Sequence, residues 1–198
     1  MALKFNYNKT TIQSFKKQLS IREKALPILK NKETALRQEV KSLAKAIEKL
    51  EEERTEIDKD LEQFKPFWKE FPNVLSLGGL NTFQKKIIGV KVREVDTIKF
   101  KIADISWWNL SPWIPLGIKM LKKKIALDLQ IEIRKEQLEK LQSARKKTTQ
   151  KVNLYEKVQI PEYSSAILKI KRFLEDKENI SKAGQKIMKR KQELKEVA

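Results

Sequence analysis

Apolar residues near the start of the chain recur at alternating steps of three and four positions. Thirteen of the sixteen positions reached from Ile12 to Phe64 are apolar, and the register does not slip. Steps that average 3.5 residues keep one narrow apolar seam on a helix, facing a partner helix. At 1.5 Å per residue this helix would be roughly 80 Å long, so we expect an elongated molecule. The seam positions are Ile12, Phe15, Leu19, Arg22, Leu26, Leu29, Glu33, Leu36, Val40, Leu43, Ile47, Leu50, Arg54, Ile57, Leu61 and Phe64.

This pattern predicts a single coiled-coil helix over residues 1–65. Because a proline removes one helical hydrogen bond and clashes with the preceding turn, we expect a kink at Pro27. The register continues unchanged beyond Pro27, so the helix is not expected to stop there. Three seam positions carry charges that we interpret as register-setting or snorkelling side chains and not as binding sites: Arg22, Glu33 and Arg54.

Residues 66–117 form an insert of different composition. They contain four of the six prolines, four of the five glycines and all four tryptophans. Apolar and polar residues alternate in two short runs, which predicts a β-hairpin over about residues 86–103 with a polar turn at Arg93–Asp96. An isolated hairpin is marginally stable, so its apolar face is expected to pack on the flanking helices, on Trp107 and Trp108, or on another protein. The apolar positions of the two runs are Ile88, Val90 and Val92, and Ile98, Phe100 and Ile102.

A helical pattern resumes at residue 118 and predicts a second coiled-coil helix over residues 118–198. Pro161 should kink it, and beyond this proline a stripe of apolar residues follows at heptad spacing. Two long helices on either side of one insert predict an all-α fold: a long intramolecular antiparallel coiled coil, with a small insert that contains the hairpin. The second helix is expected to extend some twenty residues, roughly 30 Å, past the first. Its seam is Leu127, Ile131, Leu138, Leu141, Val152 and Tyr155, and its later stripe is Phe173, Ile180, Ile187 and Leu194.

Composition argues against catalysis by the chain itself. It has neither cysteine nor histidine, so thiolate chemistry and the usual metal ligand and proton shuttle are missing. The sequence shows no phosphate-binding loop, no metal cluster and no paired carboxylates in a plausible cleft, so we expect no cofactor and no metal. There is no signal peptide and no run of 18 apolar residues, so we expect a cytoplasmic protein.

Three segments carry the resemblance of this chain to a known family. The first is Asn8-Lys9-Thr10 with the later Leu29–Glu33, and the second is Gly89-Val90-Lys91-Val92. The third and most specific runs from Thr149 to Glu156 and continues through Ile160-Pro161. With Ile167, Ile170, Leu174 and Glu178, they make the chain resemble the D subunit of the V-type and archaeal-type rotary ATPases, the counterpart of the gamma shaft of F-type synthases. Leu26-Pro27 before Ile28-Leu29-Lys30 is similar to a bacterial branch.

The resemblance implies a central-stalk rotor subunit that couples ATP hydrolysis or synthesis to rotation of a membrane ring. The implied partners are the A and B subunits of the catalytic hexamer, the F subunit, and a C (d-type) socket. The chain would be a non-catalytic subunit, peripheral to the membrane through the complex. The implied contact residues are Ile187, Lys189, Arg190, Lys191 and Leu194 at the hexamer end, Trp107, Trp108 and Trp113 at the socket end, and Val90, Val92, Ile98 and Phe100 in the hairpin.

Two features of the sequence depart from the family pattern. Where many members have paired arginines, this chain has Gln150-Lys151, and the tryptophan-rich run from Trp107 to Trp113 is not a general family feature. The tryptophans are open to two interpretations, a small core of the insert or a protein interface. Contact with a membrane surface is a weaker third interpretation.

The net charge of +18 admits a different class of function. Residues 145–198 hold 15 Lys/Arg against 7 acids, and basic helices with a pI near 9.9 are typical of nucleic-acid-binding proteins. Against this alternative, the charges spread round the helices among acids, and the aromatic residues lie elsewhere. A solvated helix face, a scaffold protein, and a basic shaft tip turning inside acidic surfaces remain the other interpretations.

Overall fold

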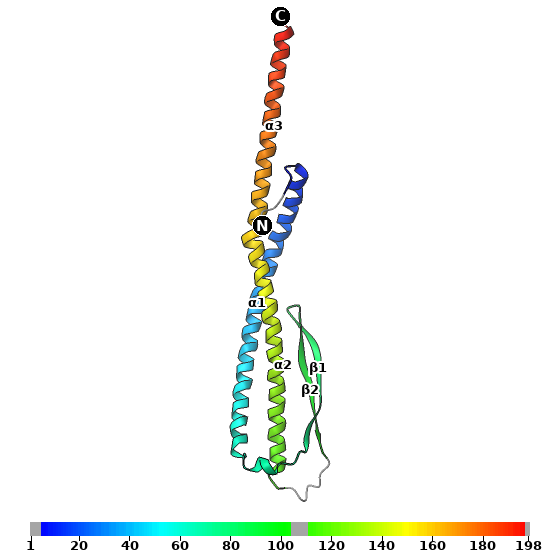
Figure 1. The fold of residues 1–198 in the computed structure, drawn as a ribbon, viewed down its shortest axis with the longest axis vertical. Helices are drawn as coiled ribbons and strands as arrows, with labels where there is room; N and C mark the ends of the chain where they lie inside the picture. Colours follow the sequence, from blue (N-terminus) through cyan, green and yellow to red (C-terminus); the bar gives the residue numbers. More distant parts are fainter. Residues whose placement is uncertain (1–4, 104–110, 197–198) are drawn as a thin grey trace. The chain divides into compact units, whose positions relative to one another are not determined.

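The computed structural model describes residues 5–103 and 111–196, with side chains described as far as Gln192 (Figure 1). The element order is helix α1 (Lys9–Gln63), a short 3-10 helix η1 (Phe67–Glu70), strands β1 (Leu75–Ile87) and β2 (Val90–Ile102), helix α2 (Ile114–Asn153), a π-helix η3 (Leu154–Gln159) and helix α3 (Ile160–Glu196). The chain divides into two compact units, one made of residues 32–147 and the other of residues 1–31 and 148–198. The fold is therefore mostly helical with one small antiparallel hairpin, as the sequence predicts.

Helix α1 contains every position of the predicted seam up to Leu61. All sixteen seam positions, including Phe64 just beyond the helix, are buried or half-buried. The Asn8 side chain caps the helix by accepting a hydrogen bond from the Thr11 amide at 2.6 Å. Pro27 lies inside the helix and does not end it. The prediction of one continuous helix is confirmed.

The unit of residues 32–147 is built on an antiparallel pair of helices. Leu36 and Leu141, both fully buried, meet in one core cluster, whereas Leu61 meets Leu127 in another. Positions that advance along α1 therefore meet positions that recede along α2. Ion pairs also cross the pair, with Lys135 Nζ at 2.6 Å from Glu51 Oε1 and Arg54 Nε at 2.8 Å from Asp128 Oδ1.

The hairpin is longer than predicted and turns at a different place. The second predicted strand lies within β2, and the first, which was expected to include Ile88, has only its part from Val90 onward in β2. Strand β1 pairs antiparallel with β2 from Leu75–Ile102 to Ile87–Val90. The turn is the two-residue loop Ile88-Gly89, and the predicted turn at Arg93–Asp96 is wrong because those residues continue β2.

Backbone geometry explains where this hairpin turns. Ile88 and Gly89 have φ of 50° and 81°, the left-handed values of the two-residue turn that fits the twist of paired strands. Gly89 adopts them without cost, whereas the branched Ile88 makes the turn hard to see in the sequence. Asp96 is the extra residue of a bulge, so a polar stretch that looks like a turn is an irregular part of a strand.

The other unit pairs the start of α1 with η3 and α3. Ala166 and Ile170 are buried in it, and the rings of Phe15 and Tyr163 meet at 5.3 Å. The predicted second helix begins at Ile114, earlier than residue 118, and it is interrupted by the six residues of the π-helix. The Ile160 amide donates to the Tyr155 carbonyl, a five-residue step that widens the turn just before Pro161. The irregularity expected at Pro161 is therefore a π-helix.

Candidate partner-binding surfaces

The C-terminal part of α3 has no buried side chain among those that the structure describes. Every described side chain from Glu175 to Gln192 is exposed, and in Figure 1 this part of α3 extends past the first turn of α1. Ile180, Ile187 and Met188 are 73%, 59% and 68% exposed. Large apolar side chains left in water on one helix are typical of a surface that a partner covers.

The basic residues expected at the hexamer end lie on this same part of the helix. Lys189, Arg190 and Lys191 are exposed, as is Ile187. Leu194 lies within α3, but its side chain is outside the described residues. Earlier on the same helix, Lys182 pairs with Glu178 at 3.0 Å, and this hydrogen bond and charge hold the pKa of Glu178 below its ordinary value. The result is a predominantly basic helix surface with apolar side chains among the charges.

The aromatic residues of the insert form a small cluster around Trp113. Its ring lies 5.8 Å from Phe67, 5.6 Å from Trp68 and 5.8 Å from Phe71. A Cβ on Gly117 would come within 3.0 Å of Trp113, so this glycine makes room for the ring. The interpretation of Trp113 as part of a small core therefore fits its contacts. Trp107 and Trp108 lie outside the described residues.

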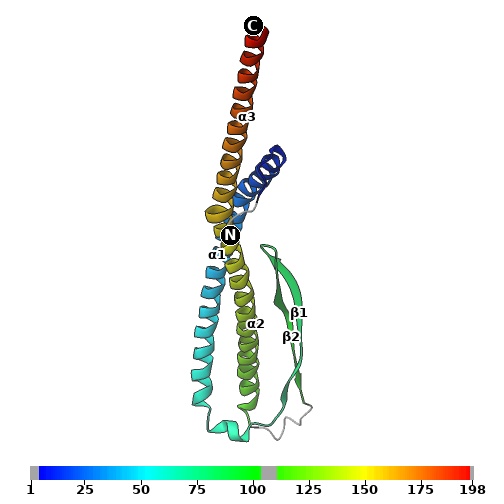
Figure 2. The same ribbon diagram turned by 45° about the horizontal axis from the view of Figure 1, so that its top comes forward.

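The hairpin packs its apolar residues on the chain's own helices. Val92 is 1% exposed, and Val90 contacts the core cluster of Leu36 and Leu141. Ile98 and Phe100 are half-buried, with Lys122 Nζ at 5.9 Å from the Phe100 ring. Of the three surfaces on which we expected this face to pack, the flanking helices are the ones that the contacts show. The hairpin lies alongside α2 in two views (Figures 1 and 2).

A cage around Arg22 holds the π-helix to α1. The guanidinium carbon lies 4.7 Å from the Tyr163 ring centre and 5.8 Å from that of Tyr155. Arg22 Nε also donates to Gln159 Oε1 at 2.6 Å. The sequence interpretation of Arg22 as a seam residue fits this position. The contacts of Arg22 with Tyr155 and Tyr163 could be predicted only from the register between the two helices.

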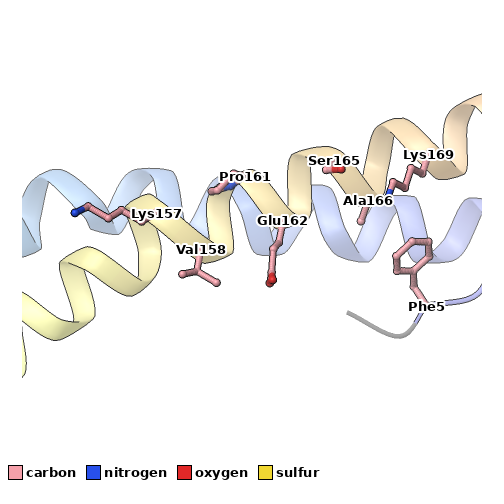
Figure 3. Close-up of a pocket in the computed structure, with 8 residues that line it drawn as sticks. All are labelled: Phe5, Lys157, Val158, Pro161, Glu162, Ser165, Ala166 and Lys169. Carbon is pink, nitrogen blue, oxygen red and sulfur yellow. The ribbon is translucent and has the colours of Figure 1, made fainter. Parts of the chain in front are cut away.

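A groove lies beside the π-helix, with a volume of about 440 Å³ (Figure 3). Phe5 closes one side, and Val158 and Glu162 point to the same side of the helix. Its lining holds no cluster of metal ligands, and the described part of the chain contains no group of three His, Cys, Asp or Glu side chains that could hold a metal ion. The groove is lined by Phe5, Lys157, Val158, Pro161, Glu162, Ser165, Ala166 and Lys169.

Among the residues that the structure describes, no helix has a stretch both long and apolar enough to cross a lipid bilayer.

Comparison with known proteins identifies the family. The sequence model of the family described as the D subunit of ATP synthase matches residues 11–190. The chain belongs to this family. It is 26% identical over 189 residues to the V-type ATP synthase D subunit of Borreliella burgdorferi, covering 94% of each chain. It is 26% identical over 208 residues to the V-type ATP synthase D subunit of Chlamydia pneumoniae, covering 98% of this chain and 96% of that one.

These matches confirm the family resemblance, including its bacterial branch. The expectation that the chain is a non-catalytic subunit agrees with the names of both relatives, which describe the D subunit of a synthase.

The segments that carry the resemblance to the D-subunit family lie at the π-helix, at a buried position of α3 and at the turn of the hairpin. Val152 is buried just before the π-helix, and Tyr155 within it contacts Arg22. Ile170 is fully buried on α3, and Gly89 sits in the left-handed turn of the hairpin. The residues that carry the resemblance are therefore ones that fix the backbone and the helix contacts.

Proposed function

We propose that the chain is the central-stalk rotor subunit of a V/A-type ATPase or ATP synthase that translocates protons or sodium ions. It would couple ATP hydrolysis or synthesis in a catalytic hexamer to rotation of a membrane ring. The observation that carries this proposal is the exposed stretch from Glu175 to Gln192, a basic helix with apolar side chains, in a member of the D-subunit family. A shaft needs such a surface because it turns inside other subunits.

Transmission of torque requires helices that resist separation and slippage. The continuous seam of α1 meets these needs, since sixteen regularly spaced side chains are buried or half-buried along it. Ion pairs such as Arg54 with Asp128 add cross-links between helices. Side chains that interlock at this regular spacing would hold the two helices in register.

The contacts of a rotor with its housing must break at every step. The exposed charges at Lys189, Arg190 and Lys191 suit this requirement, because single exposed ion pairs contribute only about 0–1 kcal/mol. Long-range attraction to acidic surfaces would centre the helix without locking it in one orientation. The A and B subunits are the proposed partners of this end.

The insert is the proposed contact with the C (d-type) socket, with Trp107, Trp108 and Trp113 as its aromatic residues. Phe67, at 48% exposed, extends the Trp113 cluster toward solvent. The F subunit is a further proposed partner, and the chain would be peripheral to the membrane through these contacts. Aromatic side chains that are only partly covered are common in protein interfaces.

A rotation experiment tests the proposal directly. The chain has no cysteine, so Ser76→Cys introduces the only thiol, at an exposed and chemically similar residue of the insert. A bead attached to this thiol should rotate in one direction when the immobilised complex hydrolyses ATP. A complex that hydrolyses ATP while the bead stays fixed would refute the rotor function.

Deletion of residues 187–198 tests which end meets the hexamer. We expect weaker coupling between ATP hydrolysis and ion transport, with assembly on the membrane sector retained. Loss of assembly with coupling intact in the remaining complexes would show that the assignment of the ends is wrong.

Binding to duplex DNA at physiological salt, without binding to ATPase subunits, would favour the nucleic-acid alternative.

A further inference from the structure

The outer edge of β1 is a long strand edge without a backbone partner among the described residues. A two-stranded sheet has two edges, and here the order is simply β1 next to β2. At 13 residues, β1 is about twice the usual length of a strand. Exposed edges of this length are normally covered or interrupted, because they pair readily with other chains.

The other edge, that of β2, faces α2. The Gln137 side chain on α2 donates a hydrogen bond to the Arg93 carbonyl, and the Arg93 side chain pairs with Glu136. A carbonyl that accepts from α2 points away from β1. Arg93 and its partner Gln84 are therefore a pair without mutual backbone hydrogen bonds.

The two-residue turn independently determines which residue pairs of the hairpin are hydrogen-bonded and which are not. Ile87 and Val90 flank the turn as a hydrogen-bonded pair, so Lys86 with Lys91 is not such a pair, and Gln84 with Arg93 is again not one. The backbone groups of Thr82, Gln84 and Lys86 consequently point outward on the free edge. Three donors and three acceptors at alternate positions match what an added strand needs.

The side chains along this part of β1 are also uncovered. All six residues from Asn81 to Lys86 are exposed, and the aromatic Phe83 among them is 48% exposed. The packing of the hairpin on the helices involves its tip, where Ile87 and Val90 contact the core. The segment of β1 from Asn81 to Lys86 therefore has a free backbone edge and exposed side chains.

The charge of the hairpin selects the kind of strand that would bind. Residues 75–102 contain six Lys/Arg and two acids. Lys86 stands directly opposite Lys91, an arrangement of like charges that destabilises a strand pair. An acidic side chain on an incoming strand would relieve this repulsion.

We propose that the outer edge of β1 between Asn81 and Lys86 binds an extended, acid-rich segment of another protein by strand addition. The outward backbone groups of Thr82, Gln84 and Lys86 supply the hydrogen bonds, and Lys86 and Lys91 select acidic side chains. Phe83 contributes an apolar contact at the centre of the site. The proposal does not depend on the rotor function.

Two other occupants of this edge lead to different results. Lysines on an edge strand also prevent pairing with a second copy of the chain. If that were their only role, no acidic strand would bind, and replacement of Lys86 would produce dimers. An anionic surface such as a phosphatidylserine vesicle or DNA would be attracted by the charge but would form no ordered backbone bonds.

Amide hydrogen exchange on the full chain distinguishes these cases. The probe is a soluble peptide of alternating glutamate and valine, compared with one of alternating lysine and valine. Strand addition predicts new protection at the amides of Thr82, Gln84 and Lys86, but little change at Phe83 and Lys85, which already bond to β2. Binding of the acidic peptide without this alternation, or equal binding of the basic peptide, would overturn the proposal.

Substitutions of Gln84 distinguish the contribution of its backbone amide to peptide binding from that of its side chain. Gln84→Pro removes an outward amide without removing a bond to β2, and we expect affinity for the acidic peptide to fall about tenfold. Gln84→Thr keeps the amide and should bind as the parent does. Equal losses in the two variants would exclude strand addition.

Charge reversal keeps the proposal testable if the proline variant does not fold. Lys86→Glu with Lys91→Glu should abolish binding of the acidic peptide, whereas Lys41→Glu with Lys45→Glu, at two exposed positions of α1, should not. Binding that survives the hairpin reversal, or that falls equally in both double variants, would contradict the selection of acidic strands by the hairpin. Dimerisation of the parent chain with protection of the same amides and no peptide would assign the edge to a second copy.

Discussion

Replacement of the two exposed isoleucines of α3 tests whether these side chains bind the catalytic hexamer or stabilise the fold of the chain. Ile180 and Ile187 lie seven residues apart and are 73% and 59% exposed. The double variant Ile180→Ser with Ile187→Ser keeps nearly the same helix propensity. Because little apolar area is lost from the folded chain, the free energy of unfolding of the isolated protein should change by less than about 0.5 kcal/mol per substitution.

The expected loss of binding follows from the area that a partner can still cover. Full burial of one isoleucine stabilises by about 1.5–3 kcal/mol. Scaled by the two exposed fractions, the pair offers about 2–4 kcal/mol to a partner that buries both residues completely. At about 1.4 kcal/mol per factor of ten, the affinity for the catalytic hexamer should fall by about thirtyfold to several hundredfold.

The assay is equilibrium binding of the chain to a hexamer that lacks its central stalk, with thermal unfolding of each variant measured in parallel. The matched control is Ile21→Ser with Ile28→Ser, which removes two isoleucines of α1 that are also seven residues apart and are 53% and 69% exposed. The control lies away from the proposed hexamer end and should leave the affinity unchanged.

Two results would refute this reasoning. Equal weakening by the α1 and α3 variants would mean that exposed apolar area anywhere on the chain contributes to binding. A large fall in the melting temperature of the isolated α3 variant would mean that these side chains support the fold, contrary to their exposure.

Three further predictions concern stability, pH and the insert. Leu141→Ala, at a fully buried position, should destabilise the isolated chain by about 2–5 kcal/mol in denaturant unfolding. Hydrogen bonds from Lys140 and, to a smaller extent, from Arg93 lower the pKa of Glu136 below its value in the unfolded chain. These bonds therefore stabilise the fold at any pH above the ordinary carboxyl pKa. Their contribution is lost as the pH falls through the lowered pKa of the folded chain. Stability measured below about pH 4 should therefore fall less in Glu136→Gln than in the parent. Replacement of Trp107 and Trp108 by alanine should loosen the stalk from the membrane sector while the hexamer still hydrolyses ATP, and unchanged ion pumping would contradict this.

The helices could be predicted from the sequence because their signal is local and periodic. Each seam position of α1 needs only its neighbours three and four residues away to define a face, and all sixteen positions are buried or half-buried in the structure. The same periodicity located Leu127 and Leu141 on α2. Antiparallel pairing followed from the single insert between the two patterns.

The hairpin and the π-helix could not be predicted in detail, for different reasons. β1 contains two adjacent glycines and a polar end, so it lacks the alternation that marks a strand. The true turn places Ile88 in a conformation that branched residues rarely adopt. Pro161 signals an irregularity, but a kink and a π-turn both relieve the same steric clash, and the sequence does not distinguish them.

The sequence did not indicate which of the candidate contact residues are exposed. The basic residues at 189–191 are exposed, but Val92 is buried within the chain. Apolar alternation identifies a strand face without telling whether the protein itself or a partner covers that face. The free edge of β1 was missed because hydrogen-bonding direction leaves no trace in composition.

The π-helix also sets the phase of the helix that follows it. A turn that closes over five residues instead of four holds one extra residue, and one residue of an α-helix corresponds to about 100° of rotation about its axis. Deleting a single residue between Leu154 and Gln159 would convert this turn to a regular one. The side chains of α3 would then keep their direction relative to Val152, whereas a regular turn that retained all six residues would rotate α3 by about 100° and move the buried Ala166 and Ile170 to another face. In this family member the orientation of the C-terminal side chains is therefore encoded by residue count as much as by residue type.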